Sequence, residues 1–178
     1  MTEDLFDWVL RRVASGPGST DPPAAVASAY SPRPLVPSPY TARMAGALTA
    51  ADLRAEGLAP ELDQPELDID PDGSGVYCTW TRASGASGGI ELDLWAGGEP
   101  QLTVQTILAE QSGDMRPAGL AGADDSLIGL SVWSGTGPFA TIVVTRAWLA
   151  FSLSIPTGPR AHDQLMSLAA VVLERVAP

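Results

Sequence analysis

Three aspartates at alternate positions are the residues whose spacing could hold a metal ion. Asp68, Asp70 and Asp72 precede Gly73 and match the first half of an EF-hand loop, D-x-D-x-D-G. Calcium needs clustered oxygen ligands, and the glycine allows a sharp turn. Thr79 stands where that loop needs a bidentate glutamate, and no flanking helices are predicted. We therefore expect an acidic, solvated turn, with the three aspartates as weak metal candidates, and no cofactor.

A serine between glycines matches the nucleophile motif of hydrolases. Ser87 lies in a G-x-S-x-G sequence at residues 85–89, and Asp124 or Asp125 and then His162 follow in the order of a catalytic triad. A nucleophile elbow needs a strand, a tight turn and a helix. This serine lies in a glycine-rich loop between two predicted strands, which argues against a hydrolase.

The single histidine and the single cysteine offer little further chemistry. His162 alone excludes a multi-histidine metal site and makes acid–base catalysis hard to assemble. Cys78 lies on the apolar face of a predicted strand, two residues before Trp80, and no neighbour in sequence would activate its thiol. We expect Cys78 in the core and His162 on the surface, and we predict that the protein is not an enzyme.

Aromatic residues are the better candidates for a binding site. The chain has five tryptophans, and Trp95 and Trp148 stand at the ends of predicted strands, where rings can line a groove. Core packing is the default for Trp80 and Trp133. One hypothesis is therefore a ligand-sensing domain whose groove is lined by Trp95, Trp133 or Trp148.

Charge narrows the classes of partner. The net charge is -11 and the isoelectric point about 4.3, which argues against nucleic acids and anionic membranes. The acidic N-terminus lacks a signal-peptide pattern, and no apolar run is long enough to cross a membrane. We expect a cytoplasmic protein, or a secreted one if a signal peptide has been removed. All basic residues are arginine, a bias typical of high-GC bacteria such as actinobacteria.

The N-terminal part of the chain reads as an arm. Residues 1–14 predict a short amphipathic helix, and residues 15–41 predict a proline- and glycine-rich linker. A helix this short must dock on its own domain, on a second copy or on a partner. The residues of the helix that we expect to contact a partner are Leu5, Phe6, Trp8, Val9 and Leu10.

Residues 42–178 predict one α+β domain. Apolar spacing predicts the order helix, two strands, helix, three strands, helix. Because hairpins connect the strands, the sheet should be mainly antiparallel, with about five strands and with helices packed on one face. The expected helices are residues 49–56, 100–111 and 159–176, and the expected strands are residues 76–81, 90–94, 127–133, 139–146 and 148–155, with loops at 61–72 and 115–126.

Several short motifs resemble a known family. Residues 48–53 look like an opening helix, 77–80 (Y-C-T-W) like a C-x-W strand and 119–126 like a degenerate G-L-G-D loop. Over about residues 44–177 the chain thus resembles small actinobacterial lipoproteins of unknown function and the related sensor domain of mycobacterial serine/threonine kinases. The resemblance implies a two-layer α+β fold with a ligand cleft and no catalytic residues. The lipobox cysteine and the second cysteine of that family are missing here.

These patterns lead to three functional hypotheses. The first is a non-catalytic binding or accessory protein that engages a protein partner, including a second copy of itself, through its N-terminal helix. The second is the ligand-sensing domain with an aromatic groove. The third is a cytosolic inhibitor or immunity protein whose acidic loop, residues 61–72, caps a basic site.

Overall fold

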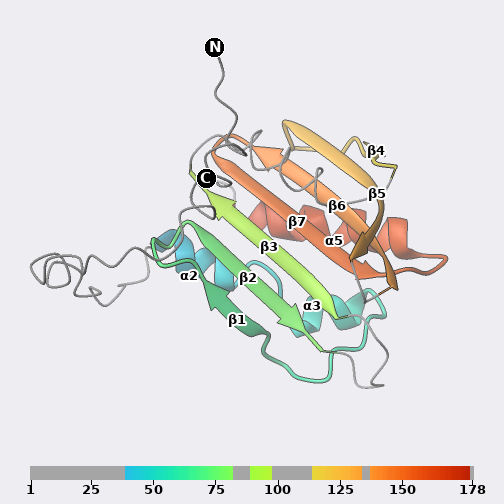
Figure 1. Ribbon diagram of the computed structural model, residues 1–178, viewed down its shortest axis with the longest axis horizontal. Helices are drawn as coiled ribbons and strands as arrows, with labels where there is room; N and C mark the ends of the chain where they lie inside the picture. The colour runs from blue at the N-terminus through green and yellow to red at the C-terminus, as the bar shows by residue number, and fades with distance from the viewer. Residues whose placement is uncertain (1–38, 82–88, 98–113, 134–136, 177–178) are drawn as a thin grey trace, which may run out of the picture. The chain divides into compact units, whose positions relative to one another are not determined.

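The computed structural model describes residues 39–81, 89–97, 114–133 and 137–176, which lie within the unit Leu35–Pro178. These residues form one antiparallel sheet of seven strands, in the order β1-β2-β3-β7-β6-β5-β4 (Figure 1). The strands are β1 (Glu66–Ile69), β2 (Gly75–Trp80), β3 (Ile90–Ala96), β4 (Arg116–Pro117), β5 (Asp125–Trp133), β6 (Gly137–Arg146) and β7 (Leu149–Pro156).

Alternation of side chains gives the sheet two different faces. Cys78, Leu92, Leu153, Ile142 and Ile128 stand in one row across five neighbouring strands, and all five are buried. Their sequence neighbours point to the other face, because successive side chains of a strand alternate. The apolar row therefore marks the face that carries the main core.

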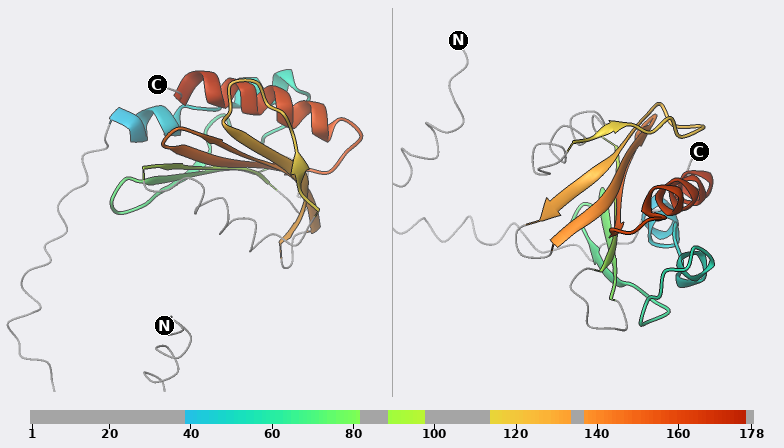
Figure 2. Two further views of the ribbon diagram at one scale, coloured as in Figure 1. Left: turned by 90° about the horizontal axis from the view of Figure 1, so that it is seen from above. Right: turned by 90° about the vertical axis from the view of Figure 1, so that its right-hand side faces the viewer.

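Within the described ranges, three helices cover this apolar face (Figure 2). They are α2 (Pro39–Ala45), α3 (Ala50–Ala55) and α5 (Ala161–Val176). The longest, α5, packs on β6 and β7, and its buried stripe includes Leu165, Leu168 and Val172. The core between helices and sheet is continuous and includes Trp80 and Phe151, both almost fully buried. Burial of a single large apolar side chain contributes about 1.5–3 kcal/mol, so this interface dominates the stability of the domain.

A charged clamp fixes α3 against the end of α5. Thr49 caps α3 in a capping box, because the Thr49 hydroxyl accepts from the Asp52 N–H while the Thr49 N–H donates to the Asp52 carboxylate. The same carboxylate accepts two hydrogen bonds from the Arg175 guanidinium, at 2.6 and 2.8 Å. These bonds, the one from Arg175 first, lower the pKa of Asp52 to about 2.

The structure confirms the α+β class and the antiparallel sheet but corrects the expected number of strands. The two unexpected strands, β1 and β4, lie in segments predicted as loops. They are edge strands of four and two residues, rich in acidic residues or proline, so their local pattern is weak and pairing with β2 and β5 defines them. Helix α2 is a further addition, because it begins inside the expected proline-rich linker.

Several expectations concern residues outside the described ranges. They are the N-terminal helix 1–14, nearly all of the linker 15–41 and the helix 100–111. Among the described helices, none has the length and apolar character needed to span a membrane.

The Asp52 clamp should contribute a pH-dependent part of the stability. The folded-state pKa is depressed, so the contribution should be complete above about pH 4 and lost as the pH falls toward 2. Asp52→Asn should lower the free energy of unfolding by about 1 kcal/mol at pH 7, a value discounted because the Arg175 side chain is 40% exposed. In urea titrations, the difference in unfolding free energy between the original protein and Asp52→Asn should be smaller at pH 2.5 than at pH 7.

The control is Asp63→Asn, which breaks the exposed ion pair with Arg54 and should change the stability by about zero. An equal loss in both variants at pH 7 would argue against the clamp.

Candidate functional site

A pocket of about 410 Å³ opens at the end of the sheet where β6 turns into β7. Tyr40 of α2 and Trp148 of the β6–β7 turn form an edge-to-face pair, with ring centroids 4.8 Å apart and planes at 72°. Tyr40 is 49% exposed and Trp148 is half-buried, so both rings offer surface to a ligand. The remaining lining consists of Asp72, Gly73 and Ser74 from the β1–β2 turn and Ala96 and Gly97 from the end of β3.

Backbone hydrogen bonds hold the walls of this aromatic pocket together. The Ala96 N–H donates to the Ser74 carbonyl (2.8 Å), and the Gly97 N–H donates to the Trp148 carbonyl (2.9 Å). Gly97 has a φ of 90°, a conformation that favours glycine. The end of β3 is thus tied to both neighbouring turns, which fixes two walls of the pocket relative to each other.

Asp124 positions Trp148. The turn between β6 and β7 places Ala147 at a φ of 50°, which is unfavourable for a residue with a side chain. The Ala147 N–H donates to the Asp124 carboxylate at 2.5 Å, and the Asp124 N–H donates to the Thr145 carbonyl at 2.8 Å. These two bonds fasten the turn that carries Trp148 to the segment before β5.

A second aromatic pair supports the β1–β2 turn from the other face of the sheet. Trp95 Nε1 donates to the Tyr77 hydroxyl (3.2 Å), which donates to the Asp70 carboxylate (3.1 Å). A Cβ atom at position 75 would collide with the Asp70 carboxylate and the Tyr77 hydroxyl, so Gly75 is required for this approach. Trp95 therefore acts as a support of the turn and does not line the aromatic pocket.

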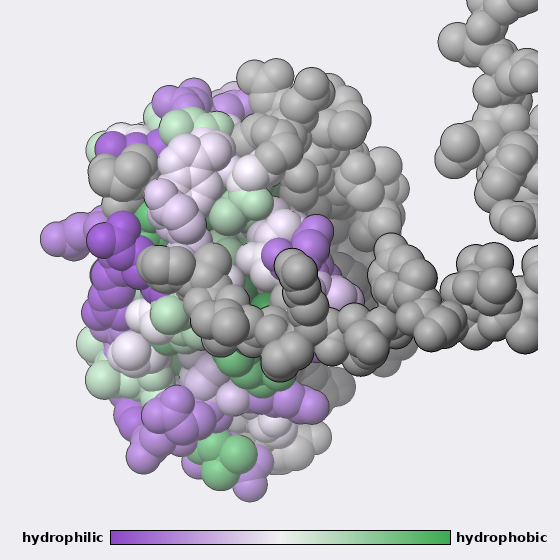
Figure 3. Space-filling model, turned by 90° about the vertical axis from the view of Figure 1, so that its left-hand side faces the viewer, coloured by the Kyte–Doolittle hydropathy of each residue, from purple (hydrophilic) through white to green (hydrophobic). Residues whose placement is uncertain are grey.

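The aromatic pocket has an acidic rim. The Ser74 hydroxyl and N–H both donate to Asp72 Oδ1, at 2.6 and 2.9 Å. These bonds lower the pKa of Asp72, so its carboxylate is charged at neutral pH. Figure 3 looks onto this end of the molecule, where strongly hydrophilic residues border paler and apolar ones. Aromatic faces beside a carboxylate attract cations.

The face of the sheet opposite the helices carries buried polar groups. Ser131, Thr141 and Ser154 form a chain of hydroxyl contacts at 2.7 and 2.9 Å. One row away, Asp93 accepts a long hydrogen bond of 3.4 Å from the Ser152 hydroxyl. Burial first, and then the charge of Glu91, raise the pKa of Asp93 to about 6. The single long hydrogen bond from Ser152 therefore does not offset the free energy needed to bury the ionised Asp93 carboxylate.

The structure separates most of the other residues considered from the sequence. Among the described residues no three acidic, histidine or cysteine side chains converge as metal ligands, and Asp68, Asp70 and Asp72 each accept a local hydrogen bond. Cys78 is buried, and burial raises the pKa of its thiol to about 11. The side chain of Trp133 and the serine at position 87 lie outside the described part of the chain.

The sequence named Trp148 as a groove residue but pointed neither to Tyr40 nor to the contact of Asp124 with the β6–β7 turn. Tyr40 belongs to a segment dominated by prolines, and its partner ring lies far along the chain. From the sequence, Asp124 is a member of a triad pattern and of the G-L-G-D-like loop at residues 119–126. An aspartate in a glycine-rich loop ahead of a strand is a common turn signal, but nothing local to it points to the β6–β7 turn.

Comparisons of the chain with protein-family models, with curated proteins and with solved structures find no match. The resemblance to actinobacterial lipoproteins and kinase sensor domains stays a prediction.

Removal of the Asp124 carboxylate should release the turn that carries Trp148. Asp124→Ala should lower the free energy of unfolding by about 1 kcal/mol, because one hydrogen bond to a charged acceptor is lost. It should also shift the Trp148 indole resonance in NMR spectra. Asp125→Ala is the matched control, since Asp125 bonds only to the adjacent Ser126 N–H in the described structure. A Trp148 resonance that moves equally in both variants would contradict this role.

Asp93 should make the protein less stable as the pH rises. Its folded-state pKa is raised above the unfolded value, so stability should fall between about pH 4 and pH 6 and then level off. Asp93→Asn should match the original protein near pH 4 and exceed its free energy of unfolding by up to about 3 kcal/mol at pH 8. Urea titrations at both pH values test this.

The control variant is Glu66→Gln on exposed edge strand β1, which should leave the difference between the two pH values unchanged. An Asp93→Asn protein that is less stable at pH 8 would show that the carboxylate is compensated.

Proposed function

We propose that the domain is a non-catalytic binding module whose aromatic pocket takes a cationic group of its ligand. The observation that carries the proposal is the exposed edge-to-face pair of Tyr40 and Trp148 beside the charged Asp72. Cations bind the faces of tryptophan and tyrosine rings, with about 0.5–2 kcal/mol per contact. The net charge of -11 adds a long-range attraction for cations.

Two features of the pocket support binding over catalysis. Among the described residues that line the aromatic pocket there is one carboxylate and no second acid or base, so these residues supply no pair for proton transfer. The walls are held by backbone hydrogen bonds, which limits the entropy lost when a ligand binds.

Two further proposals rest on the sequence alone. One is that residues 5–10 of the N-terminal helix dock on a protein partner or on a second copy. The other is an inhibitor that uses its acidic segment 61–72, of which residues 66–69 form β1.

The cation site can be tested with two probes of the same shape. Choline carries a quaternary ammonium group. Its uncharged isostere is 3,3-dimethylbutan-1-ol, in which a carbon atom replaces the nitrogen. In heteronuclear NMR titrations of the full chain, choline should shift the Trp148 indole and the Gly73 and Gly97 amides saturably. Dimethylbutanol should bind about tenfold more weakly, because it lacks the charge. Trp148→Leu should also weaken choline binding about tenfold.

The control is Leu62→Ala, which truncates an exposed apolar side chain that does not line the pocket. It should bind choline with unchanged affinity. Equal binding of the two probes, or binding that survives Trp148→Leu, would refute a cation site at these rings.

A further inference from the structure

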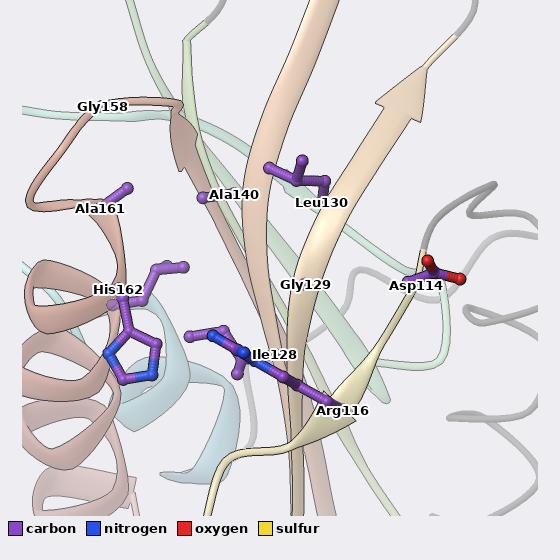
Figure 4. Close-up of a pocket in the computed structure, with 10 residues that line it drawn as sticks. Asp114, Arg116, Ile128, Gly129, Leu130, Ala140, Gly158, Ala161 and His162 are labelled. Atoms are coloured by element: carbon purple, nitrogen blue, oxygen red, sulfur yellow. The ribbon is translucent and has the colours of Figure 1, made fainter.

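We infer a second binding site, for an amphipathic carboxylate, between α5 and the outer strands of the sheet. A cavity of about 370 Å³ lies there, at the end of the β6–β7 hairpin opposite to the aromatic pocket. This size falls within the range of small-molecule sites, about 300–1,000 Å³. Figure 4 shows Arg116 of β4 and His162 of α5 pointing toward each other across the opening.

The cavity exists because α5 leaves part of the apolar face uncovered. The helix packs on β6 and β7, while Leu130 of β5, on the same face, remains 54% exposed. The floor is formed by side chains that are buried: Ile128, Ala140, Ala161 and Leu165. A large apolar side chain open to solvent above such a floor is suited to cover the hydrocarbon part of a ligand.

Register directs Arg116 into this space. Arg116 pairs with Ile128, so its side chain projects from the apolar face of the sheet, beside the cavity. Within the described residues no hydrogen bond or ion pair is recorded for its guanidinium, although the chain has twice as many acidic as basic residues, 21 against 10. An unpaired guanidinium at the mouth of an apolar cavity can bind a carboxylate with two hydrogen bonds.

The other polar groups of the cavity are His162 and Asp114, and they affect which ligand charge it favours. His162, whose side chain is 52% exposed, faces Arg116 and lies 3.4 Å from the Asp163 carboxylate. Asp114 also lines the cavity, but its carboxylate points away from the two basic side chains (Figure 4). The site thus offers the Arg116 guanidinium and the His162 imidazole on two walls above an apolar floor, which fits a carboxylate joined to a short hydrocarbon chain.

Straight-chain carboxylates are the probes for this site. In NMR titrations of the full chain, octanoate should shift the amides of Gly129, Gly158 and His162 saturably. Affinity should rise about fourfold per methylene from hexanoate to octanoate, because each buried methylene contributes a fixed transfer free energy. Octanol should bind about tenfold more weakly than octanoate, because it lacks the charge.

Two variants separate recognition of the carboxylate from burial of the chain. Arg116→Gln should weaken octanoate binding about tenfold and leave octanol binding unchanged. Leu130→Ser should weaken both probes. Arg43→Gln on α2 removes an equal charge elsewhere and should change neither.

The site would be overturned by equal affinity for octanoate and octanol, by full octanoate binding in the Arg116→Gln protein, or by the absence of saturable shifts. Octanoate shifts confined to the Trp148 indole would also overturn it. The choline titration is followed at different residues, so a negative result for one site does not affect the interpretation of the other.

Discussion

The pairing of β3 with β7 joins the two halves of the sheet. The pairing runs from Glu91 opposite Ser154 to Ala96 opposite Leu149. Strands β2 and β1 continue the sheet on one side of it, and strands β6, β5 and β4 continue it on the other. The register of this pairing keeps Leu92 and Leu94 on the same face as their partners, where both are buried in the core. A slip of one residue would move every one of these side chains to the other face. The native register also places the Gly97 N–H against the Trp148 carbonyl, and this hydrogen bond forms one wall of the aromatic pocket.

Three carboxylates show how surroundings decide the role of one side-chain type. Asp52 gains two bonds from Arg175 and stabilises the helix layer. Asp124 fastens a turn with an unfavourable backbone angle. Asp93 is buried near Glu91 with only a long hydrogen bond from Ser152, so its charge costs stability. Hydrogen bonds favour the ionised form of Asp52, whereas desolvation dominates at Asp93.

Both candidate sites lie where the helix layer ends. The aromatic pocket forms beyond α2, at the turns of β1–β2 and β6–β7, and the cavity at Arg116 forms beside the first turn of α5. Side chains at these margins, such as Tyr40 and Leu130, are exposed in part. They differ in charge: Asp72 borders the first and Arg116 the second. We therefore expect the two sites, at opposite ends of one sheet, to prefer ligands of opposite charge.

Local sequence patterns predicted the elements that bury their own apolar stripe. Helix α5 and the hairpin β6–β7 carry long, regular apolar spacing, and the structure confirms both within about two residues. Trp148, named from the sequence as a groove residue, lines the aromatic pocket, and its role in binding stays a prediction. Strands β1 and β4 escaped prediction because Glu66, Asp68 and Pro117 have low strand propensity, and pairing with neighbours overrides it.

The amino-acid sequence by itself thus determined the α+β class, the antiparallel hairpins, the last helix and the acidic surface, since each depends on near neighbours in the chain. Only the tertiary structure decided three long-range arrangements. They are the ring contact of Tyr40 with Trp148, the hydrogen bond of Asp124 to the β6–β7 turn, and the place of Arg116 and His162 in one cavity. Each joins segments whose local patterns carry no information about the other. They come together because one sheet register and one helix layer leave a single way to bury the shared core.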